Sequence, residues 1–263
     1  RTQANEILTI RNLGIRYETE HRVVQAVHDV NLTVYKGETL GLVGESGSGK
    51  TSLGRAVMRL IHINEGNIRL DTHDLAAISR DQLRKIRPQI QMIFQDPYAS
   101  LNPRKTVFDT LAEALRVRHT LSEKTVLPEV LRLLEAVGLE ATHVRKYPHE
   151  FSGGQRQRIA IARALALKPQ VIIADEPVSA LDVTVQAQIL QLLQSLSRQH
   201  GLTLIFISHD LGVIRMIADR TAVMYQGSIV EIEDTEQLFN HPSHPYTQAL
   251  LSALPAPLHL TCS

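Results

Sequence analysis

One stretch of the chain, residues 44–51, constrains the fold more than any other. It reads Gly-Glu-Ser-Gly-Ser-Gly-Lys-Thr and matches the pattern G-x-x-x-x-G-K-[ST]. An apolar run precedes it at 39–43, and apolar positions at helical spacing follow it from Leu53. A strand, a glycine-rich turn and a helix in this order form a phosphate cradle, in which backbone N–H groups and the helix N-terminus face the anion. Lys50 is then expected to reach the outer phosphates, and the Thr51 hydroxyl to bind the accompanying magnesium.

Composition excludes several classes of function. The chain has 263 residues, 43% of them hydrophobic and 21% charged, as is ordinary for a globular protein. The formal net charge of +1 gives no global field for binding nucleic acid or an anionic membrane. No apolar run of the sequence reaches membrane-spanning length, and the single cysteine, Cys262, rules out an internal disulfide framework. Any membrane association is therefore expected to come through a partner.

Apolar patterns predict an α/β framework that a helical segment interrupts. Residues 106–138 have apolar positions three and four apart, which predicts a helical insertion with a boundary or kink at Pro128. Short β-branched runs predict two strands near the N-terminus, and Tyr17 falls between them. Continuous apolar runs are typical of buried parallel strands. The predicted strands lie at 7–10, 30–34, 66–70, 90–94, 171–174 and 204–207, followed by a hairpin over 221–232.

Polar residues follow three of the buried strands, at the edge where open α/β sheets bind ligands. Gln95, the pair Asp175-Glu176 and His209 occupy these positions. Taken singly, each has a plainer interpretation. Asp175 could cap the next turn, His209 could be a structural imidazole, and Gln95 has no special claim. The glycine-rich loop by itself could be a solvent-exposed turn. Only the ordered set favours a catalytic site.

In this order the pieces resemble the ATP-binding-cassette (ABC) ATPases. The resemblance covers nearly the whole chain and implies an α/β fold with a P-loop NTPase core, in which a RecA-like parallel sheet and an antiparallel β subdomain are joined by an inserted α-helical subdomain. The expected boundaries are 1–95 and 154–235 for the ATP-binding core, 96–153 for the helical subdomain and 236–263 for a C-terminal tail. The matching pieces are the phosphate loop at 44–52, Gln95, the signature at 151–158, the strand at 171–176, residues 179–182 and His209.

The resemblance also implies a role for each residue in the hydrolysis of ATP with Mg²⁺. Glu176 is expected to polarise the attacking water, His209 to bind the γ-phosphate and Lys50 to bind the outer phosphates. The expected metal ligands are Thr51, Gln95 and, through water, Asp175, and Gln95 also contacts the water. The residues expected around the nucleotide are Tyr17, which would stack on adenine, then Gly44, Glu45, Ser46, Gly47, Ser48, Gly49, Lys50, Thr51 and Ser52, with Ser152, Gly153, Gly154, Gln155 and Asp182 at the interface with a second cassette.

Two longer stretches, 94–104 and 241–251, look like the oligopeptide, dipeptide and nickel importer branch of this family. This likeness implies a bacterial importer whose ATPase lies peripherally on the cytoplasmic face of the inner membrane. The implied partners are a second ABC ATPase subunit, two transmembrane permease subunits and a periplasmic or surface solute-binding protein. A heterodimer is favoured over a homodimer, and no nucleic acid is expected. The cargo, peptide or nickel, stays open because no residue names it.

The C-terminal stretch leaves two further alternatives open. His241 and His244 could form a metal site, but the prolines beside them favour a structural tail segment. The four-cysteine iron–sulfur cluster of many peptide-branch subunits has no counterpart here, since Cys262 is the single cysteine. That difference is compatible with a nickel-type subunit or with a shortened peptide-type one.

Two other classes of protein compete with transport. A cassette ATPase of DNA repair or translation would carry long coiled coils or paired cassettes, and the sequence has neither. A small-molecule P-loop kinase would explain the phosphate loop but would not explain residues 152–155 or His209.

Overall fold

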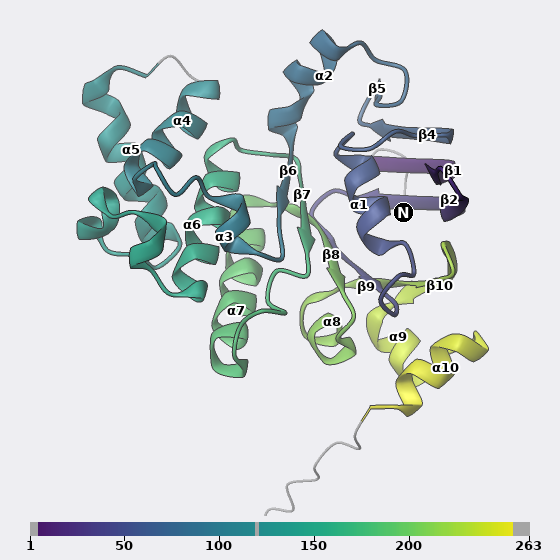
Figure 1. Ribbon diagram of the computed structural model, residues 1–263. Helices are drawn as coiled ribbons and strands as arrows, with labels where there is room; N and C mark the ends of the chain where they lie inside the picture. Colours follow the sequence, from purple (N-terminus) through teal and green to yellow (C-terminus); the bar gives the residue numbers. More distant parts are fainter. Residues whose placement is uncertain (1–4, 119–120, 255–263) are drawn as a thin grey trace, which may run out of the picture.

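The computed structural model describes residues 5–118 and 121–254, and within these residues the strands form two sheets (Figure 1). The smaller sheet is antiparallel and has the strand order β2-β1-β4-β5. The larger has the order β10-β9-β3-β8-β7-β6, in which β10 runs antiparallel to β9 and the other described strands are parallel. Cys262 lies outside the described residues. The strands are β1 (Glu6–Thr19), β2 (Arg22–Tyr35), β3 (Thr39–Val43), β4 (Glu65–Leu70), β5 (His73–Asp74), β6 (Ile90–Ile93), β7 (Val171–Asp175), β8 (Thr203–Ser208), β9 (Arg220–Tyr225) and β10 (Ser228–Asp234).

The larger sheet buries both of its faces. Side chains alternate across a strand, so the apolar runs place one set of residues on each side. Leu42 and Ile173 belong to a cluster shared with the antiparallel sheet and the first helix. Val43 and Ala174, one position along, belong to a second cluster shared with the helical segment. The predicted α/β architecture with a P-loop NTPase core and an inserted helical part is therefore confirmed.

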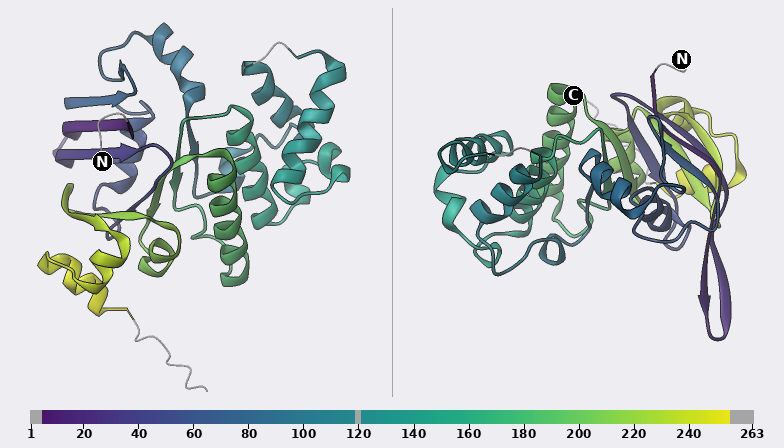
Figure 2. Two further views of the ribbon diagram at one scale, coloured as in Figure 1. Left: turned by 180° about the vertical axis from the view of Figure 1, so that it is seen from behind. Right: turned by 90° about the horizontal axis from the view of Figure 1, so that it is seen from above.

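Helices pack against both faces of this sheet, since residues of the first helix join one buried cluster and residues of the helical segment join the other. The helical segment lies at the opposite end of the molecule from the antiparallel sheet, while the β1–β2 hairpin extends away from the body (Figure 2). Among the described residues, no helix has the length and apolar character needed to cross a bilayer. The helices are α1 (Lys50–Val57), α2 (Arg80–Ile86), α3 (Pro97–Ser100), α4 (Val107–Arg118), α5 (Glu123–Ala136), α6 (Gly153–Ala166), α7 (Val183–His200), α8 (Leu211–Ile217), α9 (Thr235–Asn240) and α10 (Pro245–Ser252), with 3₁₀ turns η2 (Arg87–Gln89), η3 (Ala141–Arg145) and η4 (Pro148–Glu150).

Two local features differ from the apolar pattern. Strands β1 and β2 run on to the turn at 20–21, well past the predicted 7–10 and 30–34. The apolar pattern misses these outer parts because they are exposed and mix polar residues with the exposed Val23 and Val24. Pro128 lies inside α5 and does not mark its boundary. The hairpin over 221–232 forms as predicted, with Gln226 and Gly227 at its turn.

Candidate active site

The phosphate loop is packed too tightly for side chains at its two outer glycines. A Cβ on Gly44 would lie 2.3 Å from the Met224 carbonyl oxygen, and one on Gly49 would lie 2.4 Å from the Ala26 oxygen. Gly47 and Gly49 also have φ values of 81° and 102°, in the region that favours glycine. The loop therefore lies directly against β2 and the end of β9, with α1 beginning at its C-terminal end.

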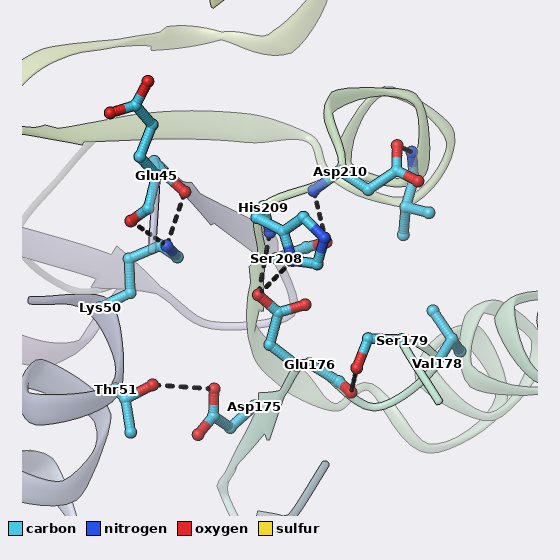
Figure 3. Close-up of polar contacts among 12 residues, drawn as sticks. Glu45, Lys50, Thr51, Asp175, Glu176, Val178, Ser179, Ser208, His209 and Asp210 are labelled. Carbon is cyan, nitrogen blue, oxygen red and sulfur yellow. Dashed lines mark hydrogen bonds and ion pairs between the residues drawn. The ribbon is translucent and has the colours of Figure 1, made fainter. Parts of the chain in front are cut away.

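Lys50 lies at the start of α1 with its side chain turned back over the loop. Its Nζ donates to the carbonyl oxygens of Gly44 (2.6 Å) and Glu45 (2.9 Å), as Figure 3 shows for Glu45. The residue is only 6% exposed, and burial lowers the pKa of its ammonium. A buried ammonium held by neutral oxygen atoms is a favourable position for an anion.

Asp175, the last residue of β7, faces Thr51. The Thr51 Oγ1 donates to Asp175 Oδ1 over 3.4 Å (Figure 3). Burial of the carboxylate, and then the nearby charge of Glu176, raise the pKa of Asp175. Carboxylate and hydroxyl oxygens are the ligands that Mg²⁺ prefers, and a buried carboxylate gains from a cation beside it. The pair therefore fits a magnesium ion.

Glu176 turns away from Asp175 although the two residues are adjacent. Its φ of 49° is left-handed, which sends the two carboxylates in different directions. Glu176 Oε1 accepts the His209 backbone N–H (3.0 Å) and lies 2.9 Å from His209 Nδ1 (Figure 3). Because Glu176 N also donates to Ile207 O (2.9 Å), the end of β7 is fixed to β8. The two acidic residues thus face different groups.

One cavity of about 440 Å³ is lined by nearly half of the predicted residues, whereas Gly44, Glu45, Ser48 and Asp175 do not line it. Tyr17 lies at its edge, where its hydroxyl is 3.0 Å from Ser52 Oγ. His209 does not line the cavity itself and reaches it through Glu176. Gln25, Gln226 and Gly227 also line it. No motif marks them as site residues, because they belong to the β1–β2 and β9–β10 hairpins. The predicted residues that line it are Tyr17, Ser46, Gly47, Gly49, Lys50, Thr51, Ser52, Gln95 and Glu176.

The signature turn at 152–155 is not part of this cavity. Ser152 caps α6: its Oγ accepts from Gln155 N (3.3 Å), and Gln155 Oε1 accepts from Ser152 N (3.0 Å). A Cβ on Gly154 would lie 2.5 Å from Val185 Cγ1, so this glycine permits close packing of α6 on α7. Asp182 caps α7 through Val185 N (3.0 Å). Among the described residues that line the cavity, neither 152–155 nor Asp182 is found.

Gln157, which the sequence singles out only as part of a motif, joins two parts of the site. Its Nε2 donates to the carbonyl oxygens of Pro177 (2.6 Å) and Phe94 (3.3 Å), and the residue is 1% exposed. One bond is to the residue after Glu176 and the other to the residue before Gln95. No periodicity or composition signal reveals these partners, because both are backbone groups distant in sequence.

The two histidines of the tail are not arranged as a metal site. His244 caps α10, where its Nδ1 accepts from Tyr246 N (3.0 Å). Within residues 5–118 and 121–254, no three His, Cys, Asp or Glu side chains are grouped so that they could hold a metal ion. The structural interpretation of residues 241–244 therefore agrees with the geometry.

Asp175→Asn is expected to stabilise the chain in the absence of nucleotide and Mg²⁺. Because its pKa is raised, the folded state retains the Asp175 proton at a pH where the unfolded chain has lost it, so stability falls as pH rises above 3.8. At neutral pH the variant should melt a few degrees higher, since 1 kcal/mol is roughly 2–4 °C in a chain of this size. The gain should shrink as pH falls toward 3.8.

Differential scanning calorimetry over a pH series measures this effect. Asp81→Asn is the matched control, because that carboxylate pairs with Arg84 on the surface and its side chain is 84% exposed. A lower melting temperature of Asp175→Asn at neutral pH would mean that the ionised carboxylate stabilises the fold.

Comparison with known proteins gives family matches over most of the chain and relatives that cover almost all of it. The family model described as ABC transporter matches residues 27–179, and the model described as the C-terminal region of oligopeptide/dipeptide transporters matches 230–259. The oligopeptide transport ATP-binding protein OppF of Bacillus subtilis is 50% identical over 255 residues, which cover 96% of this chain and 83% of that protein. The dipeptide transport ATP-binding protein DppF of Lactococcus lactis is 47% identical over 260 residues, covering 97% and 83%.

Solved structures give the same picture of the fold. The ATP-binding cassette MJ0796, captured as a dimer in a post-hydrolysis state with ADP and Pi, superimposes with a TM-score of 0.79 at 31% identity, covering 87% of this chain and 99% of that one. The cassette cbiO1 of Clostridium perfringens, part of the transporter complex cbiONQ, has a TM-score of 0.79 at 28% identity, with 90% and 92% covered.

Proposed function

Because the chain belongs to the ABC transporter family of ATP-hydrolysing cassettes, we propose that it drives peptide uptake by a bacterial importer. The observation that carries this proposal is the division of the site. One cavity holds Lys50 and Glu176, while the signature turn at 152–155 lies outside it at the start of α6. We expect such a site to bind ATP through its own phosphate loop, and to hydrolyse it only when a second cassette supplies the missing donors.

Mg²⁺ would be held by Thr51, Asp175 and Gln95. The first two oxygens already lie near each other, the raised pKa of Asp175 reflects a buried negative charge in need of compensation, and Gln95 lines the same cavity. Bound there, the ion would neutralise charge on the β- and γ-phosphates. The Gln95 amide could bind the ion without adding charge.

Hydrolysis is an in-line attack of water on the γ-phosphorus, in which the protein positions and stabilises. The Lys50 ammonium, held by two carbonyls in the structure, turns to phosphate oxygens. The Glu176 carboxylate accepts a hydrogen bond from the water and polarises it. His209 fixes that carboxylate from one side through its backbone N–H and its ring, and its ring is available to the γ-phosphate. Tyr17, at the rim, stacks on adenine.

The second cassette would place its own Ser152–Gln155 counterpart over the nucleotide of this chain. Backbone N–H groups at the start of a 14-residue helix favour an anion, which supports a γ-phosphate as the ligand. Asp182, exposed at the start of α7, would lie near the same seam. The dimer of MJ0796 supports this arrangement. We favour a heterodimer with a related cassette over a homodimer, as the likeness to the importer branch implies.

The cargo is argued from the relatives. OppF and DppF both carry names of peptide transport ATP-binding proteins, and residues 230–259 match the region that the peptide transporter family describes. Peptide uptake then requires two permease subunits and a solute-binding protein, with this chain on the cytoplasmic face of the membrane. Nickel is the competing cargo. A small-molecule kinase is excluded by the family match.

The test is uptake by a strain that lacks this chain. We expect loss of radiolabelled di- and oligopeptide uptake with retained ⁶³Ni²⁺ uptake, and recovery on expression of the parent chain but not of Glu176→Gln. The same tagged chain, purified from membranes, should bring a second cassette and two membrane subunits. Normal peptide uptake in the deletion strain, or loss of nickel uptake alone, would overturn the peptide assignment.

A further inference from the structure

The C-terminal segment reaches back to the phosphate loop. The Glu45 N–H donates to the hydroxyl of Tyr246, on α10, over 3.1 Å, although the two residues are 201 positions apart. This N–H belongs to the same peptide unit as the Gly44 carbonyl, which accepts from Lys50 Nζ at 2.6 Å. The Gly44–Glu45 peptide is therefore held on both sides, by Lys50 on its carbonyl and by Tyr246 on its N–H.

Tyr246 is itself firmly placed against the larger sheet. Its ring packs on Tyr225 at the end of β9, with centroids 4.3 Å apart and planes tilted by 32°. Tyr225 directly precedes Gln226 and Gly227, which line the nucleotide cavity. Burial raises the pKa of the Tyr246 hydroxyl, so the group is neutral at physiological pH and accepts a hydrogen bond without bringing a negative charge near the phosphates.

The segment before α10 is anchored by a single carboxylate on the edge strand β10. Glu231 accepts the backbone N–H groups of Ser243 (3.0 Å) and His244 (2.6 Å). His244 then caps α10 by accepting from Tyr246 N. These bonds fix the first turn of α10, and with it the point from which the Tyr246 ring extends toward the loop.

We propose that Tyr246 is a positioning residue of the phosphate loop, and that its hydroxyl raises the affinity of this chain for ATP and ADP. The inference rests on the proposed nucleotide-binding function. When a phosphate draws the Lys50 ammonium outward, the carbonyls of Gly44 and Glu45 lose a donor. The hydrogen bond from the Glu45 N–H to the Tyr246 hydroxyl then still holds the Gly44–Glu45 peptide in place. A loop kept in one conformation loses less conformational freedom on binding, which favours affinity.

The test is Tyr246→Phe in the full chain, which keeps the ring on Tyr225 and removes only the hydroxyl. We expect the Kd of the chain for a fluorescent ADP analogue, and the KM for ATP of its complex with a second cassette, to rise roughly two- to tenfold. The strength of one hydrogen bond sets the upper bound, and the cause is that a freed loop loses more conformational freedom when the nucleotide binds. The kcat should stay within about twofold, since a bond that holds the loop equally in ground and transition states affects binding and leaves turnover unchanged. The melting temperature without nucleotide should fall by no more than a few degrees, because the removed bond is also present in the free chain.

Ser252→Ala is the matched control. It removes a hydroxyl from the same helix that donates within α10, to Ala249 O (2.8 Å), away from the loop, and it should leave Kd and KM unchanged. Parent-like or tighter nucleotide binding by Tyr246→Phe would overturn the inference. A lower melting temperature beside an unchanged Kd would also overturn it, because the hydroxyl would then act only through folding. Failure of the parent chain to bind ATP would instead refute the proposed function.

Discussion

Glu176→Gln is expected to lower the turnover of ATP roughly 10²–10⁴-fold, the range of one general acid–base group. The amide keeps the shape of the side chain but cannot accept a proton from, or polarise, the attacking water. Glu176 lies at the edge of the cavity that holds Lys50 and is oriented by the backbone and ring of His209. Because the substitution leaves the phosphate loop intact, the affinity for ATP should stay near that of the parent.

Single-turnover kinetics and equilibrium binding of ATP separate the two effects, measured on the complex of this chain with its partner cassette. Glu236→Gln is the control, since that carboxylate pairs with Arg215 at the surface and takes no part in the cavity. Hydrolysis by Glu176→Gln at the parent rate would show that another group activates the water. A parallel loss of ATP affinity would indicate that the carboxylate contributes to binding.

The sequence predicts the fold well where apolar residues form continuous runs or recur at a regular spacing. Continuous apolar runs such as 171–174 have to be buried on both faces, so the larger sheet and its connecting helices follow from them. The pattern at 44–51 predicts a strand, a turn and a helix together. The structure leaves no room for a side chain at Gly44 or Gly49. Fold prediction is incomplete for β1 and β2, because their outer parts are exposed and mix polar with apolar residues, so that no alternation marks a buried face.

The site is predictable only in part, for a physical reason. The strand pattern places Asp175, Glu176 and His209 at the carboxyl ends of buried strands, and the pairing of β7 with β8 in the structure brings them together. It does not reveal the left-handed backbone of Glu176, which separates the Asp175 and Glu176 carboxylates and occurs together with a hydrogen bond from Glu176 N to Ile207 O on the neighbouring strand. Gln157 and Tyr246 act on backbone groups of distant segments, and such partners leave no trace in composition or spacing.

Lys50→Ala is expected to abolish measurable nucleotide binding. The Lys50 ammonium is a charged donor among the neutral backbone groups of the loop. A hydrogen bond from a charged group is worth about 1.5–3 kcal/mol, or roughly 10–150-fold in affinity. Because Lys50 would contact two phosphates, we expect the two losses of binding free energy to add, so that ATP binding falls to the limit of detection. The fold should survive, since burial already lowers the Lys50 pKa and so disfavours the charged form.

Isothermal titration with ATP and Mg²⁺ on the full chain measures this loss, and circular dichroism melting without nucleotide checks the fold. Lys36→Ala is the matched control, because its side chain is exposed in the turn before β3 and away from the loop. An ATP affinity of Lys50→Ala equal to that of the parent would place the phosphates elsewhere. The nucleotide would then have to bind mainly through contacts near Tyr17. A metal ion held by Thr51 and Asp175 would have no phosphate beside it.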